Sequence, residues 1–434
     1  MRRALLVSLL GGCSLSAPAL ALAQQSDATD GLGSVSTENS FGRDRNVSVL
    51  ERRRPDYSAE PIQIGALELM PRIAIGGGYD DNLYAQQGGR IGDAYLRIRP
   101  RVSLVRPSPN LKLSLNGELD LLRYADRASE NATQYAVSGG ALYTISRSDT
   151  LNLTARHGRY SQERVSPDSP TQASRPVRFT QSGGTATYTH VFNRLRVRGV
   201  FDVENRDYRD SVTPGGDPID QDFRDHTNYT GTAIAEYAVS PSIALFVAGS
   251  LNKRDYRERT GPIAARDSTG FDVAGGASFE LGRKARGSLR LGYLHQDYRA
   301  AAFEDVSGFL IGGELAYFLT PLVTITGTVD RGIRETGVNG ATGYLATNMT
   351  LRADYELLRN LIISIGGELE TRDFNYIDRS DDRWTWRANA AWLVSRRTAL
   401  RIDVQRRTQS STGALPGREF SGNRISLGVT FSGL

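Results

Sequence analysis

The sequence predicts an all-β fold, a transmembrane antiparallel β-barrel of about 18 strands preceded by a signal peptide and a short flexible periplasmic extension. Three observations predict it. Apolar and polar residues alternate with period two along most of the chain after residue 61. Charged residues stand in the middle of these segments, opposite an unbroken apolar face, which suits lipid outside and water inside. Short and long connections alternate, as in outer-membrane barrels.

The first residues predict export. Arg2 and Arg3 precede an apolar stretch, and Ala21-Leu22-Ala23 is a cleavage pattern, so residues 1–23 are interpreted as a secretory signal peptide. The alternative is a lipoprotein signal cleaved before Cys13. Cleavage after residue 23 removes the one cysteine of the chain, which excludes disulfides and thiolate sites. It leaves 51 Lys and Arg against 48 Asp and Glu, a balance too mild to indicate a nucleic-acid partner.

Residues 24–61 are polar and lack periodicity, so they are predicted to form a flexible periplasmic N-terminal extension. Residues 62–434 are predicted to form the outer-membrane barrel, in contact with outer-membrane lipid and lipopolysaccharide. No apolar run after residue 23 approaches the ~20 residues of a membrane helix. The mean hydropathy of −0.37 is compatible with a barrel, because alternation hides its lipid face.

Alternation places the strands and separates their faces. In Leu195 to Arg209, for example, Val197 and Phe201 share one face and Arg196 and Glu204 the other. The predicted strands are 67–79, 93–105, 111–125, 133–146, 150–164, 179–192, 194–209, 226–239, 242–257, 268–281, 285–299, 307–319, 322–334, 345–357, 361–374, 383–394, 398–409 and 420–432. Pro71 and Pro100 fall inside the first two, which calls for bulges or for different boundaries.

The connections predict the orientation. Short ones, such as Ser240-Pro241, follow the even strands, and long ones, such as 165–178 and 210–225, follow the odd strands. Short periplasmic turns and long external loops would put both termini in the periplasm. The cluster "RDYR" at 206–209 and again at 254–257 marks the outer rim of each hairpin. The alternating last strand, ending near Phe431, resembles the signal that the barrel assembly machinery recognises.

Arginines on the predicted lumen face are the main candidates for a binding or selectivity site. They are Arg97, Arg99, Arg101, Arg156, Arg196, Arg198, Arg206, Arg254, Arg286, Arg290, Arg352, Arg372, Arg387, Arg401 and Arg407. One interpretation is a cross-strand lattice of salt bridges with acids of the same face; the other is a basic constriction that selects an anionic solute. The ladder of Arg97, Arg99 and Arg101 has no acid on its own strand, so it is the best local candidate.

Five tyrosines share the lumen phase near the outer mouth. They either stack on sugar rings or pack under the loops, and they are Tyr124, Tyr160, Tyr208, Tyr256 and Tyr298. The four histidines lie on different strands, and "HGRYS" offers His157 and Ser161 without a recognisable orienting acid. We therefore predict no enzyme, no cofactor and no metal. Loop carboxylates at 217–225 and in "YDDN" at 79–82 are ordinary solvated acids or, alternatively, calcium ligands.

The segments "VLERRRPDY" at 49–57 and "PIQIGALELMPRIAIGGGYDDNLYA" at 61–85 resemble the beta-barrel porin type 2 family. The resemblance spans nearly the whole mature chain. It implies an outer-membrane component of exopolysaccharide or capsule export, whose partners would be periplasmic polysaccharide-export components and an acidic polysaccharide. The leading hypothesis is thus a conduit or accessory for exopolysaccharide secretion. The alternatives are a general or anion-selective diffusion porin for small solutes and, third, a structural or adhesive barrel.

Overall fold

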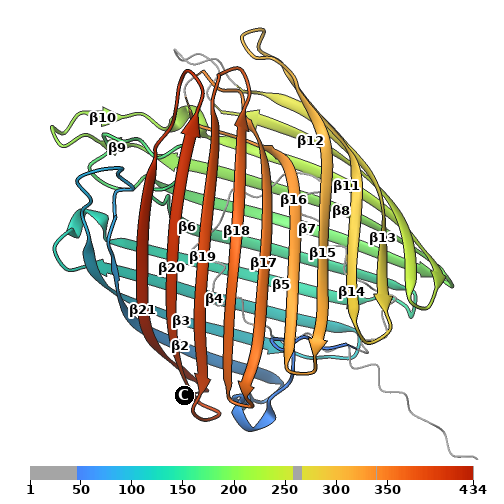
Figure 1. Ribbon diagram of the computed structural model, residues 1–434. Helices are drawn as coiled ribbons and strands as arrows, with labels where there is room; N and C mark the ends of the chain where they lie inside the picture. The colour runs from blue at the N-terminus through green and yellow to red at the C-terminus, as the bar shows by residue number, and fades with distance from the viewer. Residues whose placement is uncertain (1–45, 258–265, 339, 434) are drawn as a thin grey trace, which may run out of the picture.

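The computed structural model describes residues 46–257, 266–338 and 340–433. Within these ranges, eighteen long strands form one closed antiparallel barrel (Figure 1). They are β2 (Leu67–Asp80), β3 (Asp93–Arg106), β4 (Leu111–Tyr124), β5 (Ala132–Thr144), β6 (Asp149–Ser161), β7 (Arg178–Phe192), β8 (Leu195–Arg209), β11 (His226–Ser240), β12 (Ile243–Tyr256), β13 (Ser268–Leu281), β14 (Ala285–Tyr298), β15 (Val306–Thr320), β16 (Val323–Arg334), β17 (Tyr344–Leu358), β18 (Leu361–Phe374), β19 (Ser380–Leu393), β20 (Thr398–Thr412) and β21 (Phe420–Ser432). Pairing of β2 with β21 closes the barrel.

The predicted barrel is confirmed, and each strand boundary lies within three residues of its predicted position. Alternation explains this agreement. In β8, Val197 and Phe201 expose 37% and 53% of their surface on the outside, while Glu204 and Arg206 are buried on the lumen side. A strand of this kind therefore offers an apolar face to lipid and a polar face to the interior. Among the described residues, no helix is long and apolar enough to cross a membrane.

The two prolines stay inside their strands without a bulge, contrary to both expected solutions. Pro71 pairs with Val102 in β3, and the pairing of β2 with β21 begins only at Arg72. Pro100 pairs with Ile73, but the ladder between β3 and β4 omits Arg99 and Pro100 and then resumes in the same register. A gap in one ladder replaces the bulge, because a proline lacks only its own N–H.

The barrel has a turn end and a loop end. The turn end carries short connections, such as 193–194 and 321–322, and the last strand runs toward it (Figure 1). The loop end carries long connections, such as 162–177 and 210–225. The connection 210–225 contains the small hairpin β9 (Ser211–Val212) and β10 (Pro218–Ile219), which projects from the barrel in Figure 1. Three short 3-10 helices are η2 (Pro55–Tyr57), η3 (Ala128–Glu130) and η4 (Asp222–Arg224), and β1 (Ile62–Ile64) pairs with β2.

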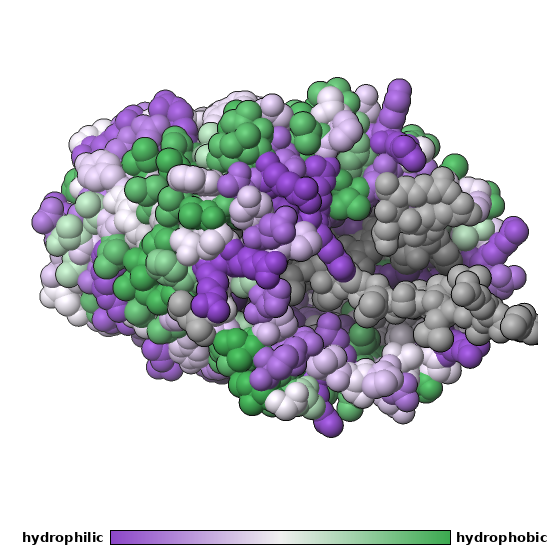
Figure 2. Space-filling model, turned by 90° about the horizontal axis from the view of Figure 1, so that it is seen from below, coloured by the Kyte–Doolittle hydropathy of each residue, from purple (hydrophilic) through white to green (hydrophobic). Residues whose placement is uncertain are grey.

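Residues 46–54 lie inside the turn end, against the lumen face of β13 to β17. The Asn46 side chain donates to the Gly282 carbonyl at 2.8 Å, and the Val49 N–H donates to Thr324 Oγ1 at 3.1 Å. Arg52 and Arg54 both bind Glu356 of β17, at 2.6 and 2.9 Å. Figure 2 looks onto this end, where hydrophilic residues gather around the middle of the view. The basic element "ERRRP" thus binds the barrel wall.

Candidate functional site in the barrel lumen

The connection 162–177 between β6 and β7 folds into the barrel. Glu163 Oε2 lies 3.0 Å from Arg407 Nη1 on β20, and the Val165 carbonyl accepts a 2.6 Å bond from Arg383 on β19. Strands β19 and β20 are not neighbours of β6 or β7. The start of the connection therefore spans the lumen from one wall to the other.

Buried polar contacts hold this inward loop, residues 162–177, at several points. Arg164 Nε donates to Glu130 Oε2 at 2.9 Å, and both side chains are buried. Asp168 accepts a 2.8 Å bond from the Gly337 N–H and lies 3.6 Å from Arg224. Arg418 donates to main-chain carbonyls of the loop. Charge-assisted bonds of this kind fix geometry, so the inward position is a built feature.

A cavity of about 440 Å³ lies beside the inward loop. Five arginines line one side of it, which we call the arginine arc: Arg97 of β3, Arg372 of β18, Arg383 of β19, Arg407 of β20 and Arg424 of β21. Since β18 to β21, β2 and β3 are consecutive in the barrel, these guanidinium groups follow one stretch of its circumference. The cavity also touches Tyr124 and Tyr160 on the strands that precede the inward loop.

The arc arginines differ in how far acids neutralise them. Arg97 is paired with Asp120, Arg372 with Glu370 at 2.7 Å, and Arg424 with Asp80 at 2.6 Å. Arg383 instead donates to the neutral Gln409 Oε1 at 3.0 and 2.9 Å and to the Val165 carbonyl, with Glu370 at 3.5 Å. Arg407 pairs with the loop carboxylate Glu163. The loop thus supplies a carboxylate partner to Arg407 and one carbonyl acceptor to Arg383.

Glu163 lies outside the strands and is strongly influenced by the arc. Burial raises its pKa, but attraction to Arg407, Arg424 and Arg383 outweighs burial, and the pKa ends below its usual value. The carboxylate is therefore ionised at neutral pH and occupies a position where the arc favours an anion.

Most of the predicted lumen arginines lie on the lumen face in ion pairs with acids of neighbouring positions. Arg101 of the predicted ladder is bound by Glu118, across from it on β4, and Arg97 by Asp120. Further ion pairs join Arg156 to Asp202 and Glu204, Arg196 to Glu236, Arg206 to Glu204, Arg254 to Glu335, Arg286 to Glu51, Arg290 to Asp330, Arg352 to Asp354, Arg387 to Glu368 and Arg401 to Asp403. Arg99 and Arg198 share that face. The salt-bridge lattice describes this wall well; the selective role remains a prediction.

The five predicted tyrosines divide into two groups. Tyr124, Tyr160 and Tyr208 line the cavity, and Tyr208 is covered by Arg224, whose guanidinium lies 4.0 Å from the ring centre. Tyr256 and Tyr298 are buried away from it, and the Tyr256 hydroxyl donates to Glu335. Tyr256 and Tyr298 therefore pack under the loops.

Sequence reasoning missed the inward loop, Arg383 and Arg424. A signal existed for both arginines: Arg424 alternates with Ile425 and Leu427, and Arg383 shares the phase of Arg387. No comparable signal existed for the loop, because nothing periodic distinguishes a connection that turns inward from one that projects outward.

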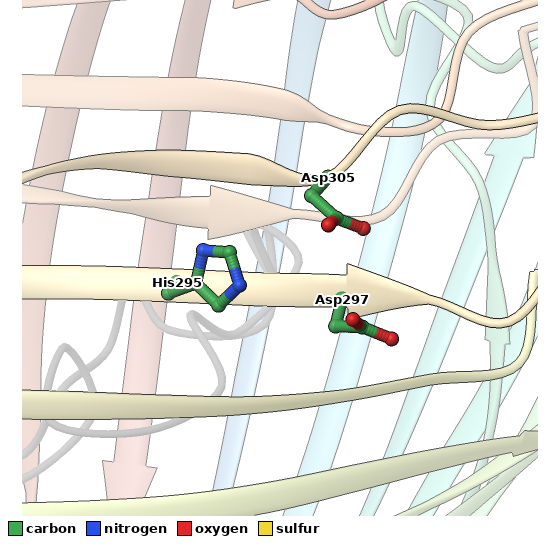
Figure 3. A group of neighbouring side chains, drawn as sticks. All are labelled: His295, Asp297 and Asp305. Carbon is green, nitrogen blue, oxygen red and sulfur yellow. The ribbon is translucent and has the colours of Figure 1, made fainter.

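Two groups of potential metal ligands occur within the described ranges, both near the loop end. His295, Asp297 and Asp305 place one ligand atom each within 4.8 Å of the others (Figure 3), and so do Asp210, Asp220 and Asp222. One oxygen of Asp305 already accepts the Tyr298 N–H at 3.0 Å. An oxygen-only group suits calcium or magnesium, and an imidazole suits a transition metal. Neither group lies beside the lumen cavity.

Residues 54–432 match the family described as Putative beta-barrel porin 2. The chain belongs to this family. It is a porin-like outer-membrane β-barrel, and the predicted resemblance is confirmed over nearly the whole described chain. No curated protein matches it.

Solved structures of similar shape come from Pseudomonas aeruginosa. The OccK2 (OpdF) structure is 13% identical, with a TM-score of 0.47 over 84% of this chain and 97% of that one. The ferric enterobactin receptor PfeA is 10% identical, with a TM-score of 0.47 over 86% and 82%. The siderophore receptor PirA is 11% identical, with a TM-score of 0.44 over 84% and 80%.

Proposed function

We propose that the protein is a diffusion channel for small anionic solutes. One observation carries this proposal: the inward loop sets Glu163 and the Val165 carbonyl against Arg407 and Arg383, beside a cavity of about 440 Å³. Cavities of roughly 300–1,000 Å³ accommodate small molecules. A polysaccharide chain would require the inward loop to leave the lumen, and buried ion pairs hold the loop in place.

Selectivity would arise from the arginine arc. Charges of one sign in a low-dielectric cleft raise the local concentration of counter-ions. An entering carboxylate or phosphate would take the position of the Glu163 carboxylate on Arg407 and gain a second donor from Arg383, which bonds mainly to neutral acceptors. A cation would meet the same guanidinium groups with repulsion, so the arc discriminates by charge.

Planar-bilayer recordings in a salt gradient test this function. The double variant Arg383→Gln/Arg407→Gln should lower the anion-to-cation permeability ratio several-fold. Arg406→Gln is the matched control, because Arg406 lies on the outward face of β20 and bonds Asn423. A wild-type channel that prefers cations, or an unchanged ratio in the double variant, would overturn the proposal.

Export of exopolysaccharide, which the family resemblance implies, gains no support from the lumen geometry or the similar structures. A comparison of a clean deletion strain with its complemented form distinguishes the two functions. Diffusion of small solutes predicts unchanged extracellular polysaccharide and reduced uptake of anionic nutrients. Loss of secreted polymer that complementation restores would instead make the barrel an export component.

We place the loop end at the cell surface and the termini in the periplasm, because long connections face outward in outer-membrane barrels. The mature chain expected after signal cleavage has no cysteine, so single cysteines report topology directly. A membrane-impermeant maleimide should label Gly215→Cys on intact cells and Arg283→Cys only after lysis. The reverse pattern would invert the orientation.

A further inference from the structure

Five arginines line a hollow of about 970 Å³ at the loop end, on the strands β6 to β8, on the connection between β6 and β7, and directly after β12. They are Arg159, Arg175, Arg178, Arg209 and Arg257. None of them belongs to the arginine arc. We call these five residues the outer arginine cluster.

Arg159, Arg178 and Arg209, the strand residues of the cluster, face the lipid side of the wall. Arg178 of β7 pairs directly with Arg209 of β8, while the adjacent Phe179 and Tyr208 stack at 5.1 Å on the opposite, lumen face. Further along the outer face of β8, Val203 and Phe201 are apolar, and Phe201 exposes 53% of its surface. The arginines therefore stand where the apolar belt of the barrel gives way to the loop end.

Acids neutralise only one member of the cluster. Arg257 pairs with Asp225 at 3.1 Å and Asp207 at 3.6 Å. Arg175, Arg178 and Arg209 form no ion pair with any acid of the described residues, and Arg159 lies 5.7 Å from the Tyr135 ring centre. Like charges directly opposite on one face, such as Arg178 and Arg209, are destabilising without a counter-charge. Four carboxylates also line the hollow: Asp207 and Asp225, which pair with Arg257, and Asp210 and Asp222 of the connection beyond the strand ends.

An apolar groove of about 840 Å³ lies on the same outer face, nearer the middle of the wall. Its floor includes Gly199, Gly231 and Gly249 on the consecutive strands β8, β11 and β12, with Phe201 and Leu251 beside it. A Cβ atom added at Gly199 or Gly231 would meet no atom within 4 Å, so the glycines leave space. The distance from Arg209 to Phe201 is roughly 26 Å along a strand. At a strand tilt of ~45°, this corresponds to about 19 Å along the bilayer normal. That distance is comparable to one leaflet of about 15 Å.

We propose that the outer arginine cluster binds the phosphorylated headgroup of a glycolipid of the outer leaflet, whose acyl chain enters the apolar groove. Guanidinium forks bind phosphate oxygens in pairs, and Arg178 and Arg209 offer two forks side by side. A lipid is favoured over a soluble polyanion because the basic cluster and the apolar groove share one lipid-facing surface. The proposal rests on the orientation proposed above and is independent of transport.

Native mass spectrometry of the detergent-solubilised barrel tests the site with two probes of equal acyl chains: lipid A and its dephosphorylated form. The wild type should retain lipid A, also in EDTA, because no metal bridge is required. The triple variant Arg159→Gln/Arg178→Gln/Arg209→Gln should lose roughly tenfold or more in lipid A affinity, a change of about 1.4 kcal/mol, and bind the dephosphorylated form as the wild type does. Arg123→Gln/Arg406→Gln, which removes two outward arginines elsewhere, should bind like the wild type.

A groove variant separates the two halves of the site. Gly231→Leu should weaken binding of both lipids, because an added Cβ meets no atom within 4 Å and the larger side chain would occupy the groove. Heat-modifiable gel migration confirms that each variant is folded. Equal affinity of the wild type for both lipids, equal affinity of the triple variant and wild type for lipid A, loss of binding in EDTA, or arginine-dependent binding of a soluble acidic polysaccharide with no lipid A binding would overturn the proposal.

Discussion

Two sectors of the lumen wall contrast sharply. The charged sector, on β18 to β21 with β2 and β3, carries the arginine arc and contacts the inward loop. The apolar sector, on β11 to β15, buries Ile234, Phe246, Leu294 and Leu310 in one cluster on its lumen side. Water and ions would follow the first and avoid the second. The pattern of alternation thus divides lumen from lipid, but it does not decide what the lumen face contains.

The difference has a physical consequence for stability. In the charged sector each group depends on a partner, because an unpaired buried charge is costly. In the apolar sector each group contributes buried area and contacts, which add up over neighbours. A second substitution, made at the partner of the first, should therefore restore part of the stability in the charged sector and reduce it further in the apolar sector.

Double substitutions in the two sectors test that difference and should have the largest effect on stability. Arg372→Ala, which leaves Glu370 buried without its closest partner, should destabilise the barrel by about 3 kcal/mol, and adding Glu370→Ala should recover part of the loss. Leu294→Ala should also cost about 3 kcal/mol, but adding Leu310→Ala should increase the loss. Urea unfolding in lipid vesicles measures both cycles. A double variant at 370 and 372 that is less stable than Arg372→Ala would erase the contrast.

The inward loop contacts the charged sector through Glu163. Glu163→Gln removes the anion that occupies the arc and should raise the anion-to-cation permeability ratio about threefold, as expected for one charge in a pore ring. Bilayer reversal potentials measure the ratio. Glu419→Gln, an exposed loop carboxylate, serves as the control. A lower ratio in Glu163→Gln would show that this carboxylate does not compete with the permeating anion.

A smaller effect is expected from a substitution at the turn end, below the apolar sector. Glu356→Gln weakens the pairs that hold Arg52 and Arg54, so residues 46–54 should become cleavable by trypsin added from the turn end. Protease digestion followed by mass spectrometry detects the cuts. Glu314→Gln, a change on the lumen face of β15, should leave the segment protected. Equal protection in both variants would mean that main-chain contacts, such as that of Val49 with Thr324, suffice.

The smallest effect concerns pH at the loop end. Burial, together with repulsion from Asp207, raises the pKa of Asp225 from 3.8 to about 6, despite the bond from the Tyr208 N–H and the attraction of Arg257. The folded state then holds this proton more tightly than the unfolded chain, so its contribution to stability falls as pH rises from 3.8 to about 6. Asp225→Asn should flatten this part of the pH dependence of the urea midpoint. Asp217→Asn, in the same connection, should not.

The sequence by itself determined the barrel, its strand count and the face of nearly every strand. Period-two alternation is a local property, and residues such as Val197 and Arg196 carry it whatever lies around them. It was sufficient to place the predicted arginines on the lumen face. It was weaker on β12, where Phe246 faces the lumen and Val247 the lipid, because both faces are apolar there.

Only the tertiary structure decided the site. Asp120 meets Arg97 because the register of β3 and β4 sets them near each other, and register depends on neighbours that alternation does not specify. Glu163 meets Arg407 across 244 positions of sequence because a non-periodic loop turns inward. Arg178 and Arg209 become neighbours through the pairing of β7 with β8. Periodicity assigns a face to each residue, whereas contacts between distant residues arise only when the barrel closes.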